Sequence, residues 1–305
     1  GSFVALGLCT HYRFFLYPAA AILFLILFRA AQSQWKNPRL WVCILIACLG
    51  LIPILWFNLS NQLSSASFYF VDRHPWEFQA SGLLHVFKQA GLVTPPLYLL
   101  FVYTNYLMYQ KASHGDRSAA LLLSFSLVNV LVYLLLAPWT DATSTSIHWP
   151  LSGYFPLLIY VPYALRSAAN LLGTYFTIQT AHRLVITIPI IGFLGTLTAL
   201  FGVGSQAFQL QLQPLIGAGV LSNKMAGWTQ FSSHVDELLQ REFAESPLLL
   251  TDNYYTLAQV EFAGLTRQGF TLDEEKAVRD GRITQYQLWK KDRVGLETVA
   301  ASEYL

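Results

Sequence analysis

The segment Asp72-Arg73-His74 carries side chains suited to binding a phosphate. A guanidinium is a planar fork of hydrogen-bond donors that matches phosphate oxygens. The cluster therefore fits a clamp on a lipid-linked phosphate at a membrane surface. The alternative is an interfacial arginine that pairs with Asp72 or with bulk lipid headgroups.

A second polar segment, residues 141–156 (DATSTSIHWPLSGYFP), lies between long apolar runs. Polar groups between membrane spans lie in the headgroup layer or line a cavity. His148 stands before Trp149 and is suited to hydrogen-bond a phosphate or an acceptor hydroxyl, or to be an interfacial histidine beside an anchoring tryptophan. Asp141 is of the type that serves as a general base, and a turn residue in a solvated loop is the other interpretation.

Near the start of the chain, His11 and Arg13 interrupt an apolar run. A basic residue there is suited to an anionic lipid headgroup, and a snorkelling side chain is the alternative. The candidate phosphate-binding and substrate-binding residues are therefore Arg73, His74, His148, Arg13 and His11.

The composition indicates that a bilayer surrounds much of the chain. Of the 305 residues, 54% are hydrophobic and 12% are charged, whereas a soluble domain is about one quarter charged. The first 204 residues hold 10 Lys/Arg and 4 Asp/Glu, and residues 205–305 hold 9 Lys/Arg and 13 Asp/Glu. This asymmetry predicts an all-α polytopic membrane bundle at residues 1–204, followed by a small α/β soluble domain at residues 205–305.

Six apolar stretches approach the length of about 20 residues that a membrane-spanning helix needs. They are residues 14–31, 40–57, 91–109, 118–136, 151–165 and 184–203. Residues 58–90 and 138–150 would form polar loops between them. Within the first loop, residues 76–89 place apolar side chains on one helical face, which predicts a helix lying in the interface plane.

The basic residues predict the orientation. Seven of them fall in alternate loops, and the positive-inside rule places these loops in the cytoplasm: Arg29, Lys36, Arg39, Lys111, Arg117, Arg166 and Arg183. The loops at 58–90 and 138–150 hold only Arg73 and Lys88. We therefore expect a multi-pass protein of the cytoplasmic membrane whose two polar loops and C-terminal domain face outside, which is the periplasm in a bacterium.

The C-terminal segment has a pattern of its own. Residues 247–252 predict a short strand and residues 254–263 a helix. Residues 283–289 (ITQYQLW) predict a second strand, because their apolar and polar residues alternate. For Asp252-Asn253, which follows the first strand, the default interpretation is a helix N-cap.

Several common sites have no sequence signature here. The chain has no Walker A, GxGxxG, HExxH or CxxC motif, so we expect no cofactor, and a divalent metal is not indicated. Cys9, Cys43 and Cys48 lie in apolar segments and are interpreted as small hydrophobic side chains. No basic cluster with interleaved aromatics suggests a nucleic acid partner.

Five segments, taken in order, resemble one family of membrane enzymes. They are GLCTHYRFFLYPAA (7–20), WFNLSNQLSSASFYF (56–70), IHWPLSGYFPLLI (147–159), TDNYYTLAQVEF (251–262) and GRITQYQLW (281–289). Their order and spacing resemble those of the bacterial dolichyl-phosphate-mannose-protein mannosyltransferase-like family, which are glycosyltransferases of the GT-C fold. The chain departs from the family at His11, where lysine is common.

The resemblance implies transfer of a sugar from a polyprenyl phosphate to a lipid, glycan or protein acceptor on the external face. It also implies that the catalytic carboxylate lies in a loop N-terminal to residue 1, so Asp141 does not inherit that role. The chain begins inside an apolar run, and we expect an N-terminal portion to precede it. The alternatives are a polytopic transporter or a lipid-binding membrane scaffold with a periplasmic domain.

Overall fold

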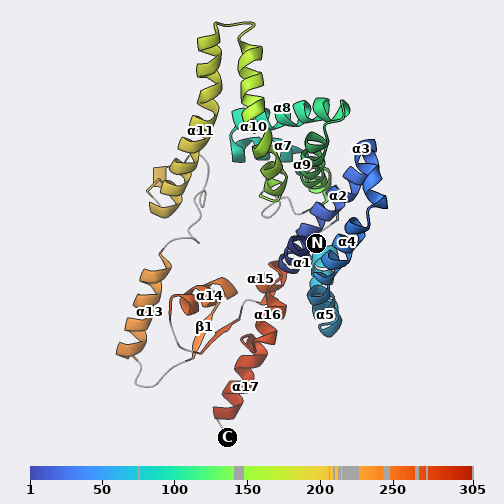
Figure 1. Ribbon diagram of the computed structural model, residues 1–305. Coiled ribbons are helices and arrows are strands. Elements are labelled where there is room, and N and C mark those ends of the chain that lie inside the picture. The colour runs from blue at the N-terminus through green and yellow to red at the C-terminus, as the bar shows by residue number, and fades with distance from the viewer. Residues whose placement is uncertain are drawn as a thin grey trace. The chain divides into compact units, whose positions relative to one another are not determined.

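The computed structural model describes residues 1–74, 76–140, 148–205, 207–208, 210–211, 214, 227–242, 248–264, 268–272 and 274–303 (Figure 1). The chain divides into two compact units. Unit 1 comprises residues 1–67 and 74–195, and unit 2 comprises residues 68–73 and 196–305. The second boundary falls inside a helix, between Gly195 and Thr196.

Unit 1 is built from helices. Its first half contains α1 (Ser2–Thr10), the short helix η1 (Tyr12–Phe15), α2 (Leu16–Leu27), α3 (Arg29–Gln32), η2 (Ser33–Lys36), α4 (Pro38–Leu49), α5 (Ile52–Ser60) and α6 (Ser64–Ser67). Its second half contains η4 (Ala80–Leu84), α7 (His85–Val93), α8 (Pro95–Ser113), α9 (Arg117–Leu136), η5 (Ala137–Trp139), α10 (Leu151–Leu172) and the first part of α11 (Ile178–Ser205).

Helix α9 is the centre of unit 1, because it packs against α2, α8 and α10. The core that these helices share contains Phe101 and Met108 from α8 and Leu157 from α10. Small side chains, Ala119 and Ala120 among them, occupy the start of α9. Such small residues allow helix backbones to approach closely. In lipid this matters because the hydrophobic effect does not drive helices together and van der Waals packing must do so.

Three of the described helices are long and apolar enough to cross a membrane: Pro38–Ser60 (α4 with α5), Arg117–Trp139 (α9 with η5) and Ile178–Ser205 (α11). The expectation of about six spans is therefore not supported. Helix α2 has only 12 residues, and the many tyrosines and amides of α8 and α10 make these two long helices too polar. Both nevertheless pack directly on α9.

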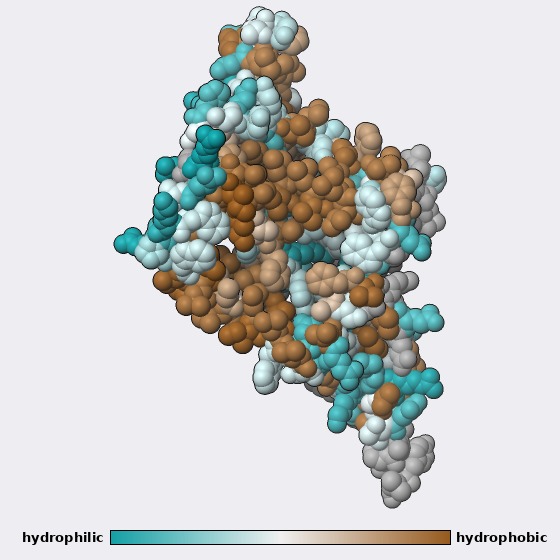
Figure 2. Space-filling view, turned by 90° about the vertical axis from the view of Figure 1, so that its right-hand side faces the viewer, coloured by the Kyte–Doolittle hydropathy of each residue, from teal (hydrophilic) through white to brown (hydrophobic). Residues whose placement is uncertain are grey.

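The three candidate spans differ in what surrounds them. In the most apolar window of α9, 39% of the residues are buried, against 6% in α4–α5 and 6% in α11. A helix that is apolar on all sides and not covered by protein is typical of contact with lipid. Figure 2 shows extensive hydrophobic surface, and exposed large apolar side chains are frequent on α4, α5 and α11.

The predicted interfacial helix begins later than expected, at Ala80 instead of Trp76, and continues to Val93 through η4 and α7. It exposes the apolar side chains of Leu83, Leu84 and Phe87 and buries His85 and Gln89. Apolar groups outside and polar groups inside are the distribution expected where the surroundings are hydrocarbon.

Unit 2 contains η3 (Phe68–Asp72), the end of α11, α13 (Trp228–Glu242), β1 (Leu249–Thr251), α14 (Tyr254–Phe262), β2 (Gly269–Thr271), α15 (Glu274–Arg279), α16 (Ile283–Leu288) and α17 (Arg293–Glu303). The strands β1 and β2 are parallel, with Leu249 opposite Gly269. Helix α14 connects them, as a parallel pair requires a crossover. Its buried Leu257 and Val260 pack with Phe270 of β2.

The prediction of a strand at residues 247–252 is confirmed by β1, and that of a helix at 254–263 by α14. Asn253 caps α14, because its Oδ1 accepts a hydrogen bond of 2.9 Å from the Thr256 N–H. The strand predicted at 283–289 is wrong, since these residues form α16. Tyr286 is buried there and donates a hydrogen bond to the carbonyl of Tyr254, a contact that sequence alternation does not reveal.

Candidate functional site

Trp149, near the end of the second polar loop, lies at the centre of a group of cationic and aromatic side chains in unit 1. It is 8% exposed. The Arg13 guanidinium carbon lies 3.6 Å from the centre of the Trp149 ring. The rings of Tyr133 and His74 lie 5.5 and 5.8 Å away from it, centre to centre. We name Arg13, His74, Trp76, Tyr133, His148 and Trp149 the Trp149 cluster.

Arg13 reaches Trp149 from the short helix η1, and His11 sets the beginning of that helix. The His11 backbone is extended, and its Nδ1 accepts a hydrogen bond of 3.1 Å from the Arg13 N–H. His11 is thus an exposed capping residue on this helix. A guanidinium stacked on an indole is attracted by the ring face, and its edge N–H groups still point outward.

His74 enters the cluster from the first polar loop. Its buried ring meets the rings of Trp76 and Trp149 nearly at right angles, at 5.4 and 5.8 Å. Trp76 has a φ of +54°, which is rare for a bulky side chain. Such strain is a feature of ligand-binding segments, where surrounding contacts hold the backbone in place.

His148, like Trp76, is an exposed member of the cluster, and its ring centre lies 6.4 Å from that of Trp149. Arg13, His74 and His148, which the sequence analysis selected separately, are therefore brought together around one tryptophan. A half-buried cation with two imidazoles beside it can donate several hydrogen bonds to an anion.

Hydrogen bonds between helices hold the base of the cluster. The Tyr17 hydroxyl donates to the Ser152 carbonyl at 2.9 Å. The Ser152 hydroxyl lies 3.0 Å from Oδ1 of the buried Asn129, on α9, and 3.1 Å from the Trp149 carbonyl. Gly153 allows this approach, because a Cβ there would lie 2.8 Å from the Ser126 carbonyl oxygen. Trp149 is therefore fixed to α2, α9 and α10.

The two predicted external loops meet beside the cluster. The Gln79 N–H donates to the Pro138 carbonyl at 2.7 Å, and the rings of Phe78 and Trp139 lie 5.5 Å apart. Gly82 contacts the backbone of η5 so closely that an added Cβ would lie 2.5 Å from the Ala137 carbonyl oxygen. The two loops are therefore in contact with each other near the end of α9.

The remaining candidates are not assigned to the Trp149 cluster. Arg73 belongs to unit 2, where its guanidinium carbon lies 5.4 and 5.9 Å from the ring centres of Phe68 and Tyr69. Asp141 lies outside the described residues, as does the side chain of Asp72. Within the described part of the chain, no group of three or more His, Cys, Asp or Glu side chains is placed to hold a metal ion.

Sequence reasoning had no means of finding the role of Tyr133 and Trp149. In the sequence, Tyr133 is predicted to lie in a span and Trp149 to anchor one, and Arg13 is far from Trp149. The only available signal was that His148 and Trp149 lie together at the end of an apolar run. Comparisons of the chain with protein-family models, with curated proteins and with solved structures found no match.

Proposed function

We propose that this chain is part of an integral membrane glycosyltransferase that takes a sugar from polyprenyl phosphate, and that the Trp149 cluster binds the phosphate of this donor. The observation that carries the proposal is the Arg13 guanidinium, 3.6 Å above the Trp149 ring with His74 on the same ring. The order of the sequence segments that resemble GT-C glycosyltransferases supports the choice of a transferase.

The chemistry needs a cationic site at the membrane surface. An acceptor hydroxyl attacks the anomeric carbon of the sugar, the bond from that carbon to the phosphate oxygen breaks, and its electron pair leaves with the phosphate. Arg13 and His148 would stabilise the charge that develops on that oxygen. A general base must also take up the acceptor proton, and no residue of the Trp149 cluster is assigned that role.

The proposed position of the site follows from the same geometry. The cluster lies where the two loops predicted to be external meet, at the end of α9. We infer that this end of α9 lies at the headgroup layer, where a lipid-linked phosphate emerges while the prenyl chain stays in the hydrocarbon. We place the loops and unit 2 on the outer side of the cytoplasmic membrane, with the acceptor approaching from there.

The test is binding of polyprenyl phosphate to the purified protein in nanodiscs, with the uncharged polyprenol of equal length as the reference ligand. The preference for the phosphate over the alcohol should fall about tenfold in Arg13→Ala, because a charged hydrogen bond contributes about 1.5–3 kcal/mol. Arg13→Lys should restore part of it. His148→Ala should also lower this preference.

Arg39→Ala is the matched control, since it removes an exposed arginine of unit 1 that lies outside the cluster. The proposal fails if the polyprenyl phosphate binds equally well to wild type, Arg13→Ala and His148→Ala. In membranes that contain the protein, the same two substitutions should slow sugar transfer from a polyprenyl-linked donor. Phosphate binding that persists without any transfer to acceptors would favour the lipid-binding scaffold.

A further inference from the structure

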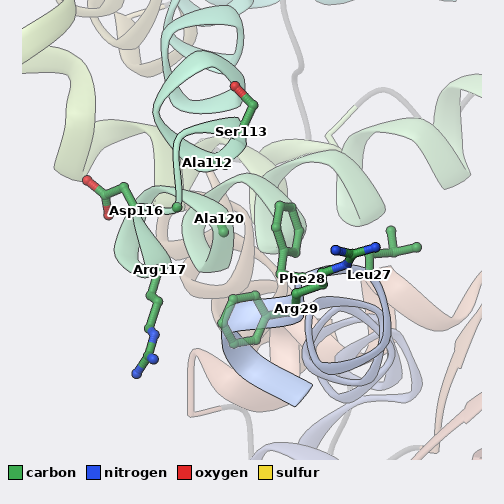
Figure 3. Close-up of a pocket in the computed structure, with 10 residues that line it drawn as sticks. Leu27, Phe28, Arg29, Ala112, Ser113, Asp116, Arg117 and Ala120 are labelled. Atoms are coloured by element: carbon green, nitrogen blue, oxygen red, sulfur yellow. The ribbon is translucent and has the colours of Figure 1, made fainter. Parts of the chain in front are cut away.

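A cavity of about 370 Å³ lies between the end of α2 and the turn that joins α8 to α9 (Figure 3). Its floor is apolar, and its rim carries charge. The lining residues are Phe24, Leu27, Phe28, Arg29, Ala112, Ser113, Gly115, Asp116, Arg117 and Ala120. They belong to unit 1, and none of them is in the Trp149 cluster.

The first wall of the cavity results from the way α2 ends. Phe28 has an extended backbone, with φ −99° and ψ 109°, so the helix stops at Leu27 and the chain turns. Side chains satisfy the carbonyls that the stop leaves open. The Gln32 amide donates to the Ile26 carbonyl at 2.7 Å, and the Trp35 indole N–H donates to the Leu25 carbonyl at 3.2 Å. The turn places the Phe28 ring and Arg29 at the cavity.

The second wall is the turn between α8 and α9. Gly115 has φ +93°, a conformation that suits glycine. Asp116 caps α9, because its Oδ1 accepts hydrogen bonds of 2.9 and 3.0 Å from the N–H groups of Ser118 and Ala119. The Asp116 carboxylate therefore already has donors.

The charges of the rim sum to +1, since Arg29 and Arg117 outnumber Asp116. Figure 3 shows the two arginines on different sides of the cavity, with Phe28 and Leu27 beside Arg29. Among the described residues, neither arginine forms an ion pair. An apolar floor below a basic rim matches a molecule that has a hydrocarbon chain and an anionic head.

We infer that this cavity holds the headgroup and the first part of an acyl chain of an anionic glycerophospholipid. The positive-inside rule places Arg29 and Arg117 on the cytoplasmic side, and the lipids of that leaflet are rich in anionic headgroups. A soluble phosphate would leave the aromatic and aliphatic floor unused. A zwitterionic lipid would gain little from the net positive rim. The inference does not depend on the proposed transferase activity.

The experiment uses the purified protein in nanodiscs of equal parts phosphatidylglycerol and phosphatidylcholine, and native mass spectrometry counts the lipids that stay bound. Wild type should retain phosphatidylglycerol in preference to phosphatidylcholine. Arg29→Gln and Arg117→Gln should each lower this ratio about fivefold, as expected for one basic residue near a membrane surface. Ser113→Phe keeps both arginines, fills the cavity from an exposed helical position, and should lower retention as well.

Lys36→Gln with Arg39→Gln is the control, because it removes two basic residues from the same predicted side without touching the lining. The inference is overturned if this control lowers the ratio as much as the arginine variants, since the attraction would then be diffuse. Unchanged retention in Ser113→Phe would also overturn it. So would displacement of the lipid by soluble glycerol phosphate, which would identify a site for the headgroup alone. Circular dichroism should give equal helix content for all variants.

Discussion

Arg13 has a packing role in the structure and a binding role in the proposed function. Its stacking on Trp149 at 3.6 Å contributes about 0.5–2 kcal/mol, depending on how far the pair is desolvated. The stacked face is the poorly hydrated part of a guanidinium, whose N–H donors lie in its plane. Lysine carries the same charge without the flat face, so we expect it to replace Arg13 only in part.

His85 is a buried imidazole whose hydrogen bonds favour the neutral form. Its Nε2 lies 3.3 Å from the Gln89 amide nitrogen, and the Gln89 Oε1 accepts a hydrogen bond of 2.9 Å from the Tyr154 hydroxyl. In this arrangement the Gln89 amide donates to the imidazole. Burial, and secondly the charge of Lys88, lowers the pKa of His85 below its ordinary value of 6.5.

This lowered pKa predicts a stability that depends on pH. The unfolded chain takes up the His85 proton near pH 6.5, whereas the folded chain resists it, so stability falls as pH drops below 6.5. Thermal unfolding in nanodiscs at pH 7.5 and 5.5 measures the difference. His85→Gln, which cannot titrate, should lose less stability over this interval than wild type. Equal losses in the two proteins would show that His85 does not contribute.

At the scale of elements, two glycines near each other in the sequence should respond to alanine in opposite ways. At Gly82, in η4, an added Cβ would lie 2.5 Å from both the Ala137 carbonyl oxygen and the Pro138 Cα. The backbone must then shift, and we expect Gly82→Ala to destabilise the fold by about 1–3 kcal/mol. At Gly91, inside α7, a Cβ would meet no atom within 4 Å. Gly91→Ala should therefore stabilise the helix by about 0.5–1 kcal/mol.

Chemical or thermal unfolding of the two variants beside wild type tests this pair. The matched design separates the close contact of η4 with η5 from the general effect of losing a glycine. A Gly82→Ala protein as stable as Gly91→Ala would mean that the two polar loops do not approach each other as closely as the structure has them. The proposed phosphate site would then lose the support of the first loop.

At the scale of the whole molecule, α9 should cross the membrane, so that its two ends lie on opposite sides. Ser113 precedes α9 and Glu77 lies in the loop that packs near its end, and both are exposed. Cysteines placed at these two positions should react with an impermeant maleimide from opposite sides of sealed vesicles. The background protein has serine at Cys9, Cys43 and Cys48. Labelling of both new cysteines from the same side would contradict α9 as a span.

The sequence predicts well what depends on apolar character along the chain. Three of the expected spans, at residues 40–57, 118–136 and 184–203, fall within the apolar helices of the structure. The expected spans at residues 91–109 and 151–165 correspond to α8 and α10, which pack on α9 but are too polar to count as candidate spans. The helix α16 was mistaken for a strand, since ITQYQLW alternates and the contact from Tyr286 to Tyr254 is tertiary.

For the candidate site, sequence selected the cations but not their arrangement. Arg13, His74 and His148 stood out because charged and imidazole groups are rare in an apolar chain. Their common neighbour, Trp149, was unremarkable as one interfacial tryptophan among several. The grouping depends on contacts between distant segments, which a single sequence does not reveal. The role of His11 as a cap likewise needed the backbone geometry of η1.

The hydrogen bond between Asn129 and Ser152 has a consequence for biosynthesis. Asn129 lies in α9, and its Oδ1 accepts a hydrogen bond from the Ser152 hydroxyl of α10. Helix α10 is synthesised after α9. A nascent chain that has inserted α9 alone carries an amide oxygen into hydrocarbon before its partner arrives. We therefore expect the two helices to enter the membrane together, as a helical hairpin.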